Sequence, residues 1–110
     1  MRLRLSSRGI DLAEAEREQI ERMLRQALSR HASLVAAVAV TLLPSPRMHG
    51  IGLVWCRIRT RQRNGRSWIV EEHAAGARQS AFAASARVEG RLDRERGLRQ
   101  LDRPSFLLAR

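Results

Sequence analysis

The chain has 110 residues, and its 21 basic residues, all of them arginine, outnumber its 11 acids to give a formal net charge of +10. This length suits one domain around one core, and a positive balance of this size points to a polyanionic partner. The excess lies mostly after residue 34, because residues 35–76 carry 6 arginines against 2 acids and residues 77–110 carry 8 against 4. Aromatic residues make up only 4% of the chain, so phosphate contacts must dominate any binding of nucleic acid.

The sequence has no feature that is typical of a secreted or membrane protein. Cys56 is the single cysteine, which excludes an intramolecular disulfide, and residues 1–5 carry charges where a signal peptide needs an apolar stretch. The longest apolar run, residues 34–44, has about half of the ~20 residues that a membrane-spanning helix requires. We therefore expect a cytoplasmic protein with no membrane partner.

The first third of the chain predicts a strand followed by a helix. Apolar and polar side chains alternate over residues 1–6, as in a strand with one buried face and one basic face that carries Arg2 and Arg4. Asp11 and Glu14 have the spacing of a capping box. Apolar side chains then recur at three-and-four spacing within a helix of about residues 12–31, namely Ile20, Met23, Leu24, Ala27 and Leu28.

A second strand is predicted over residues 35–42, because this apolar stretch is short and its β-branched residues favour a strand over a buried helix. Both faces of this strand are apolar, so the sequence does not decide which face is buried. Pro44 and Pro46 must end it, since proline cannot donate to a ladder, and the stretch to Gly50 is predicted to be a loop.

The clearest strand covers residues 53–63. Its even positions, from Val54 to Thr60, form an inward set, whereas Trp55 and four arginines project from the opposite face. Asn64 and Gly65 predict a hairpin turn, and residues 68–70 form the returning strand before Glu71 and Glu72.

From about residue 77 the chain is predicted to be helical, with a fraying point or an end near Gly97. One face carries Ala81, Phe82, Ser85, Val88 and Leu92, and the other carries Arg87, Arg91 and Arg94. The element order therefore predicts an α+β fold of β-α-β-β-β-α type, with a four-stranded mixed sheet and both helices packed on one face. We assign residues 1–99 to this domain and residues 100–110 to a C-terminal tail.

The candidate nucleic-acid-binding residues are arginines on the exposed faces of these elements. Alternate residues of a strand lie roughly 6.6–6.8 Å apart, so a row of arginines on one strand can follow a phosphate backbone. A solvated sheet or helix face is the alternative, and Glu89, Asp93 and Glu95 can neutralise part of the helical stripe. The predicted RNA-binding set is Arg2, Arg4, Arg57, Arg59, Arg61, Arg63, Arg87, Arg91 and Arg94.

No residue pattern in the sequence predicts catalysis, a metal or a cofactor. Cys56 falls on an inward strand position and is predicted to pack as a small hydrophobe. The three histidines lack the spacing of a zinc site, and Glu71, Glu72 and His73 are neighbours on one strand whose side chains cannot converge. We expect a non-enzymatic protein with no catalytic residue, metal site, cofactor or small-molecule substrate.

Two segments resemble the ribosome hibernation promoting factor and ribosome-associated inhibitor family in its short form. The first contains Leu3, Leu5, Ile10, Leu12, Glu14-Ala15 and Arg17-Glu18, and the second contains Phe82-Ala83-Ala84, Val88, Arg91-Leu92 and Arg94. The chain is a diverged relative, because Glu16, Ser85 and Arg96 stand where the family has apolar residues and Ala13 replaces its helix-capping threonine. Met23 and Gln26 also replace lysines that the family often has on the first helix.

The resemblance implies a fold similar to double-stranded-RNA-binding domains and a protein that silences idle ribosomes. Such a protein would bind rRNA of the small ribosomal subunit at the decoding region and block the mRNA and tRNA sites, as a monomer when free. Two other functions fit the same residues. One is binding of structured RNA away from the ribosome, and the other is a regulatory module whose basic face meets an acidic protein.

Overall fold

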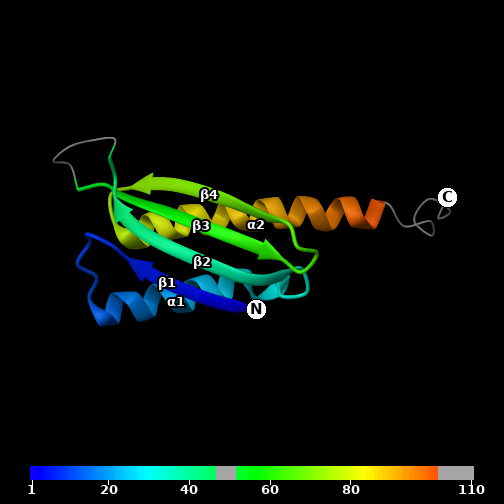
Figure 1. Cartoon of the computed structure of the whole chain (residues 1–110), viewed down its shortest axis with the longest axis horizontal. Coiled ribbons are helices and arrows are strands. Elements are labelled where there is room, and N and C mark those ends of the chain that lie inside the picture. The colour runs from blue at the N-terminus through cyan, green and yellow to red at the C-terminus, as the bar shows by residue number, and fades with distance from the viewer. Residues whose placement is uncertain (47–51, 102–110) are drawn as a thin grey trace.

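The computed structural model describes residues 1–46 and 52–101, which form one sheet and two long helices (Figure 1). The predicted order of elements is confirmed. The strands are β1 (Arg2–Ser7), β2 (Val35–Pro44), β3 (Val54–Gln62) and β4 (Ser67–Ala74). The helices are α1 (Glu14–Leu28), the short 3-10 turn η1 (Ser29–His31) and α2 (Ala77–Leu101).

The sheet is mixed, as predicted, and its strands lie in the order β1-β2-β3-β4. β1 runs parallel to β2, whereas β2 with β3 and β3 with β4 are antiparallel pairs. A tight turn joins β3 to β4, and Gly65 adopts a φ of 92° there, a conformation that an L side chain rarely takes. The predicted turn at Asn64 and Gly65 is therefore confirmed.

Both helices cover one face of the sheet and leave the other face open (Figure 1). Ile20, Leu24 and Leu28 of α1 are fully buried, as the helical spacing predicts. From the sheet, Val54, Cys56 and Ile58 meet this layer, which confirms the inward set of β3. No helix of residues 1–46 or 52–101 covers the opposite face of the strands, which we call the open face.

The register of β2, which the sequence leaves undecided, follows side-chain size. Val38, Val40 and Leu42 are buried in the core, whereas Ala37 and Ala39 lie on the open face. A bulge between Val35 and Ala37 shifts the alternation, so that Val35 is buried as well. Burying the larger side chains removes more apolar area from water, which explains the choice of face.

Several element boundaries differ from the predicted ones. Helix α1 begins at Glu14 with Ala13 at its N-cap and no side-chain cap, so the capping box at Asp11 is wrong. Strand β4 continues to Ala74, because Glu71 and His73 pair with β3 residues. Helix α2 passes through Gly97 to Leu101. The predicted tail falls almost wholly on residues 102–110, which lie outside the described residues.

Phe82 was predicted on the buried face of α2, but 63% of its surface is exposed. The buried stripe consists of Ala77, Ala81, Ala84, Ser85, Val88 and Leu92. Phe82 follows Ala81 by one residue, which turns it about 100° away from that stripe. Ala84, two residues further along the helix, is fully buried in the core instead.

Ser85 and Arg96 stand where the family that the sequence resembles has apolar residues, and both side chains form hydrogen bonds within the fold. Ser85 is buried, and its hydroxyl donates to the Phe82 carbonyl at 2.9 Å. Arg96 donates to the Arg30 carbonyl at 2.8 Å, and its guanidinium lies 3.3 Å from Nδ1 of the buried His31. The α1–α2 contact thus ends in a polar cluster where an apolar pair is expected.

His31 makes folding stability depend on pH. Burial lowers its pKa, and the charges of Arg30 and Arg96 add to this effect, whereas Asp93 and Glu89 oppose it. The unfolded chain therefore binds the proton more readily, so the contribution of neutral His31 is complete above its unfolded pKa of about 6.5 and declines as pH falls below it.

We expect the stability advantage of the unsubstituted protein over His31→Gln to shrink between pH 7.5 and pH 5. Urea unfolding of both proteins across this range measures the difference, and glutamine serves as the control because it does not titrate. An advantage that grows as pH falls would contradict the assignment of a lowered pKa.

Candidate nucleic-acid interface

Four arginines of the open face lie in two rows that cross the sheet. Arg2 on β1 aligns through Ala37 on β2 with Arg61 on β3, and Arg4 aligns through Ala39 with Arg59. Neighbouring strands are about 4.8 Å apart, so each pair of arginines brackets a methyl group across roughly 9.6 Å. We call these four residues, Arg2, Arg4, Arg59 and Arg61, the arginine frame.

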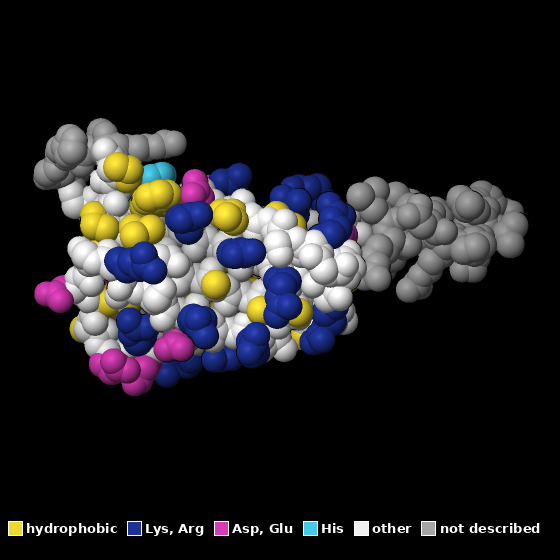
Figure 2. All heavy atoms as spheres, viewed as in Figure 1, with side chains coloured by type: hydrophobic (Ala, Val, Ile, Leu, Met, Phe, Trp, Pro, Cys, Tyr) yellow, Lys and Arg dark blue, Asp and Glu magenta, His cyan; other side chains and the backbone are white. Residues whose placement is uncertain are grey.

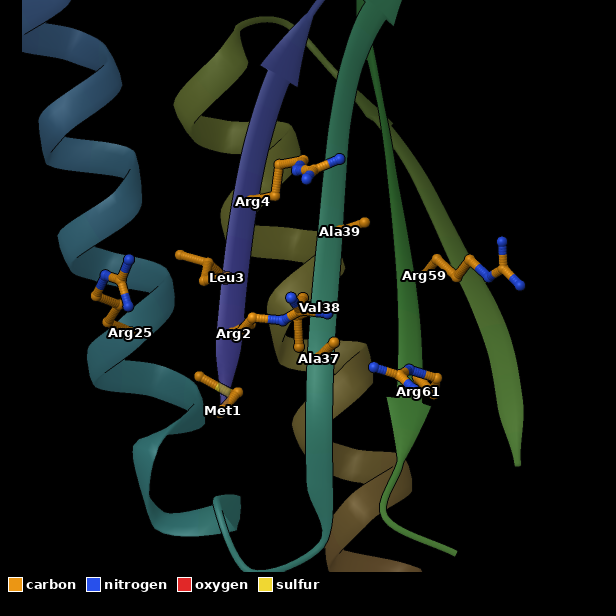
Figure 3. Close-up of a pocket in the computed structure, with 10 residues that line it drawn as sticks. All are labelled: Met1, Arg2, Leu3, Arg4, Arg25, Ala37, Val38, Ala39, Arg59 and Arg61. Carbon is orange, nitrogen blue, oxygen red and sulfur yellow. The ribbon is translucent and has the colours of Figure 1, made fainter. Parts of the chain in front are cut away.

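The arginine frame surrounds a hollow of about 670 Å³. Figure 3 shows Ala37 and Ala39 on β2 between the arginines of β1 and those of β3. The small alanine side chains let an incoming group approach the backbone, while the longer arginines rise on both sides. Such a hollow fits a chain of phosphates that lies along β2 and is gripped from two sides.

Arg25 lines the same hollow from α1, beside the edge strand β1 (Figure 3). The predicted RNA-binding set does not contain Arg25. The sequence indicates only that Arg25 is exposed, because it follows the buried Leu24 by one residue on the helix. Its place at the hollow follows only from the position of α1 beside β1, which the sequence does not show.

No described residue neutralises the frame arginines. Among the described residues, Arg2, Arg4, Arg59 and Arg61 form no ion pair and no side-chain hydrogen bond, and all four are exposed. Glu71 is the one acid among the outward-facing residues of the four described strands. Like charges held this close repel one another, so a bound anion would stabilise the arrangement.

The two candidate arginines nearest to acids are engaged internally. Arg57 Nε lies 3.1 Å from Glu71 Oε2, without the alignment of a hydrogen bond, and the two residues face each other across β3 and β4. Arg87 donates to Glu72 Oε2 at 2.9 Å and to the Glu71 carbonyl. Both pairs are partly exposed to solvent, so their contribution to stability is small.

The other three candidates are not members of the frame. Arg63 follows β3, and its Nε donates to the Ala32 carbonyl at 3.0 Å. Arg91 of α2 places its guanidinium carbon 4.3 Å from the ring centroid of the buried Trp68. Arg94 is exposed on α2 with no side-chain partner among the described residues. The structure therefore brings together Arg2, Arg4, Arg59 and Arg61, and it leaves Arg87, Arg91 and Arg94 on the helical layer or its edge.

Cys56 packs within the core, as its inward strand position predicts. Cys56 is fully buried in the core, and burial, with a smaller effect of Glu72, raises its pKa to about 12, so the thiol stays protonated. Across the described ranges 1–46 and 52–101, no three His, Cys, Asp or Glu side chains are placed to hold a metal ion. No helix in this part of the chain combines the length and apolar character that a bilayer crossing requires.

Two solved structures resemble this one over nearly the whole of their own chains. A ribosomal subunit interface protein from Coxiella burnetii has a TM-score of 0.71 and 11% sequence identity, and the match covers 88% of this chain and 99% of that one. The N-terminal domain of Thermus thermophilus Protein Y has a TM-score of 0.66 and 21% identity, with 86% and 98% covered. This chain has the fold of these two proteins. No family model and no curated protein matches its sequence.

Proposed function

We propose that this protein is a non-catalytic ribosome-associated factor whose open sheet face binds rRNA of the small subunit. The observation that carries the proposal is the arginine frame, in which four exposed guanidinium groups surround Ala37 and Ala39 without any internal counter-charge among the described residues. Arginine presents a planar fork that binds phosphate oxygens in pairs, so the frame matches a polyphosphate backbone.

The ribosome is the proposed source of that RNA for two reasons. The sequence resembles the hibernation-factor family at both ends of the domain, and a structure with the same fold is a ribosomal subunit interface protein. By the same resemblance, the protein binds at the decoding region as a monomer and excludes mRNA and tRNA by occupying their space. This activity needs no bond to be made or broken, and it places the protein in the cytoplasm.

The remaining candidate arginines have secondary roles in this proposal. Arg57 and Arg63 extend the basic row of β3 beyond the frame, although each is already held by a partner within the fold. Arg87, Arg91 and Arg94 would contact RNA that passes the β4 edge or the end of α2. The domain that acts in this way comprises residues 1–99.

Co-sedimentation with purified ribosomal subunits at increasing salt tests the proposal. We expect the protein to travel with the small subunit and with whole ribosomes in a sucrose gradient. If ~6 phosphates are contacted, log affinity should fall against log salt with a slope between about −4 and −5. A protein that stays at the top of the gradient at low salt, or binds with a flat salt response, would contradict the proposal. Retained affinity for naked structured RNA in that case would favour an RNA-binding protein that acts off the ribosome.

A further inference from the structure

The open face has a second region, at the end opposite to the row of Arg2 and Arg61, where a tryptophan and a histidine lie beside each other on neighbouring strands. Trp55 on β3 pairs in register with His73 on β4, and their rings are stacked with centroids 5.8 Å apart and planes 9° from parallel. Figure 2 shows apolar side chains and a histidine together at one end of this face, whereas arginines are spread over the rest.

The stack of Trp55 and His73 is held in a fixed orientation. Nδ1 of His73 lies 2.8 Å from the Ser45 hydroxyl, which restrains the imidazole ring from the end of β2. The guanidinium carbon of Arg57 lies 5.7 Å from the ring centroid of Trp55, and Glu71 restrains that guanidinium in turn. Two rings held parallel at a surface form a platform on which a third flat ring can stack.

A hollow of about 520 Å³ lies beside this stack, lined by Ile69, Glu71, His73 and Arg87. Its volume is within the range of about 300–1,000 Å³ that small-molecule pockets have. Ile69 gives it an apolar wall, since 46% of this residue is exposed. The Glu71 carboxylate would repel a phosphate here, but it can accept a hydrogen bond from an N–H group on the edge of a nucleobase.

We infer that the Trp55–His73 stack and the adjacent hollow receive an unpaired nucleobase of the RNA whose phosphates bind the arginine frame. This inference rests on the proposed function and specifies its ligand as single-stranded RNA. Trp55 precedes Arg59 by four strand residues and Arg61 by six, which places the stack roughly 13–20 Å from the frame. A single strand of a few nucleotides can span that distance, so one short unpaired segment can reach both the stack and the frame.

An eight-nucleotide unpaired RNA and an abasic strand of the same length and charge provide the test. Fluorescence anisotropy with the full chain should show tighter binding of the base-bearing strand. Trp55→Leu should weaken that binding about 5- to 10-fold and leave its salt slope and the affinity for the abasic strand unchanged. Trp55→Phe, which keeps a ring, should retain most of the affinity.

Phe82→Leu is the matched control, because it removes an exposed aromatic ring from α2, in the other layer of the molecule. It should change neither affinity. Should Trp55→Leu fail to fold, the unsubstituted protein provides a second measurement. Its tryptophan emission should respond to the base-bearing strand and not to the abasic one, because Trp68 is buried and bonded to Gln62.

The outcomes separate this inference from the proposed function. Equal affinity for the two strands, together with dependence on Arg59 and Arg61, overturns the base platform and keeps phosphate binding. Failure to bind either strand or the ribosome overturns both. If Trp55→Leu weakens association with the ribosome but leaves affinity for the RNA strand unchanged, the stack contacts a ribosomal protein and the inference is wrong.

Discussion

Replacing Arg59 and Arg61 by glutamate should lower the affinity for small-subunit rRNA on the order of 100-fold at physiological salt. The double variant loses two phosphate contacts, and it places two negative charges on β3, across β2 from Arg2 and Arg4, where they repel a phosphate chain that lies along β2. Both side chains are exposed on the open face, so the fold should be unaffected. Affinity is measured by co-sedimentation and by anisotropy with an rRNA fragment.

Arg22→Glu combined with Arg78→Glu is the control for net charge. These residues are exposed on α1 and α2, away from the open face, and the control changes the total charge by the same amount. We expect its affinity to remain within about 3-fold of the unsubstituted protein, because neither side chain lines the hollow of the arginine frame and exposed charges are partly screened by salt. Equal losses in the two double variants would mean that net charge, and not the arginine frame, determines binding.

The second large effect is a loss of folding stability when a side chain on the buried face of the sheet is shortened. Ile58→Ala should lower the free energy of unfolding by about 2–5 kcal/mol, because Ile58 is fully buried on β3 in the layer that α2 covers. Such a loss is a large part of the roughly 5–15 kcal/mol that stabilises a domain of this kind. Urea unfolding followed by circular dichroism measures it.

Ile69→Ala is the matched substitution on the other face. Ile69 lies on β4 opposite Arg59 and is 46% exposed, so the same change should cost no more than about 1 kcal/mol. The arginine frame depends on this assignment of faces. A cost for Ile69→Ala equal to that for Ile58→Ala would place the core on the wrong side of the sheet and invalidate the frame.

The sequence predicts β3 well because its two faces differ in chemistry. Arginine at every second position of this strand leaves only the residues between them for the core, and the structure buries that set. The helical spacing of Ile20, Leu24 and Leu28 is equally clear. Both faces of β2 are apolar, so the alternation of its side chains does not indicate which face is buried. The buried face is the one whose larger valines pack against the helices.

The candidate site was only partly predictable for a related reason. The exposed positions of Arg2, Arg4, Arg59 and Arg61 follow from strand alternation, but their assembly into one frame requires the pairing of β1 through β2 to β3. The β4 extension, which brings Glu71 against Arg57, was missed because acidic residues are uncommon in strands. Tertiary pairing therefore decided which arginines are free and which are held.

A cryo-electron microscopy map of the protein bound to the small ribosomal subunit would test the central claim most directly. We expect the open face of the sheet to lie against rRNA, with the guanidinium groups of Arg59 and Arg61 within hydrogen-bond distance of phosphate oxygens and both helices directed away from the contact. A complex in which α1 and α2 contact the rRNA while the arginine frame faces solvent would contradict the account.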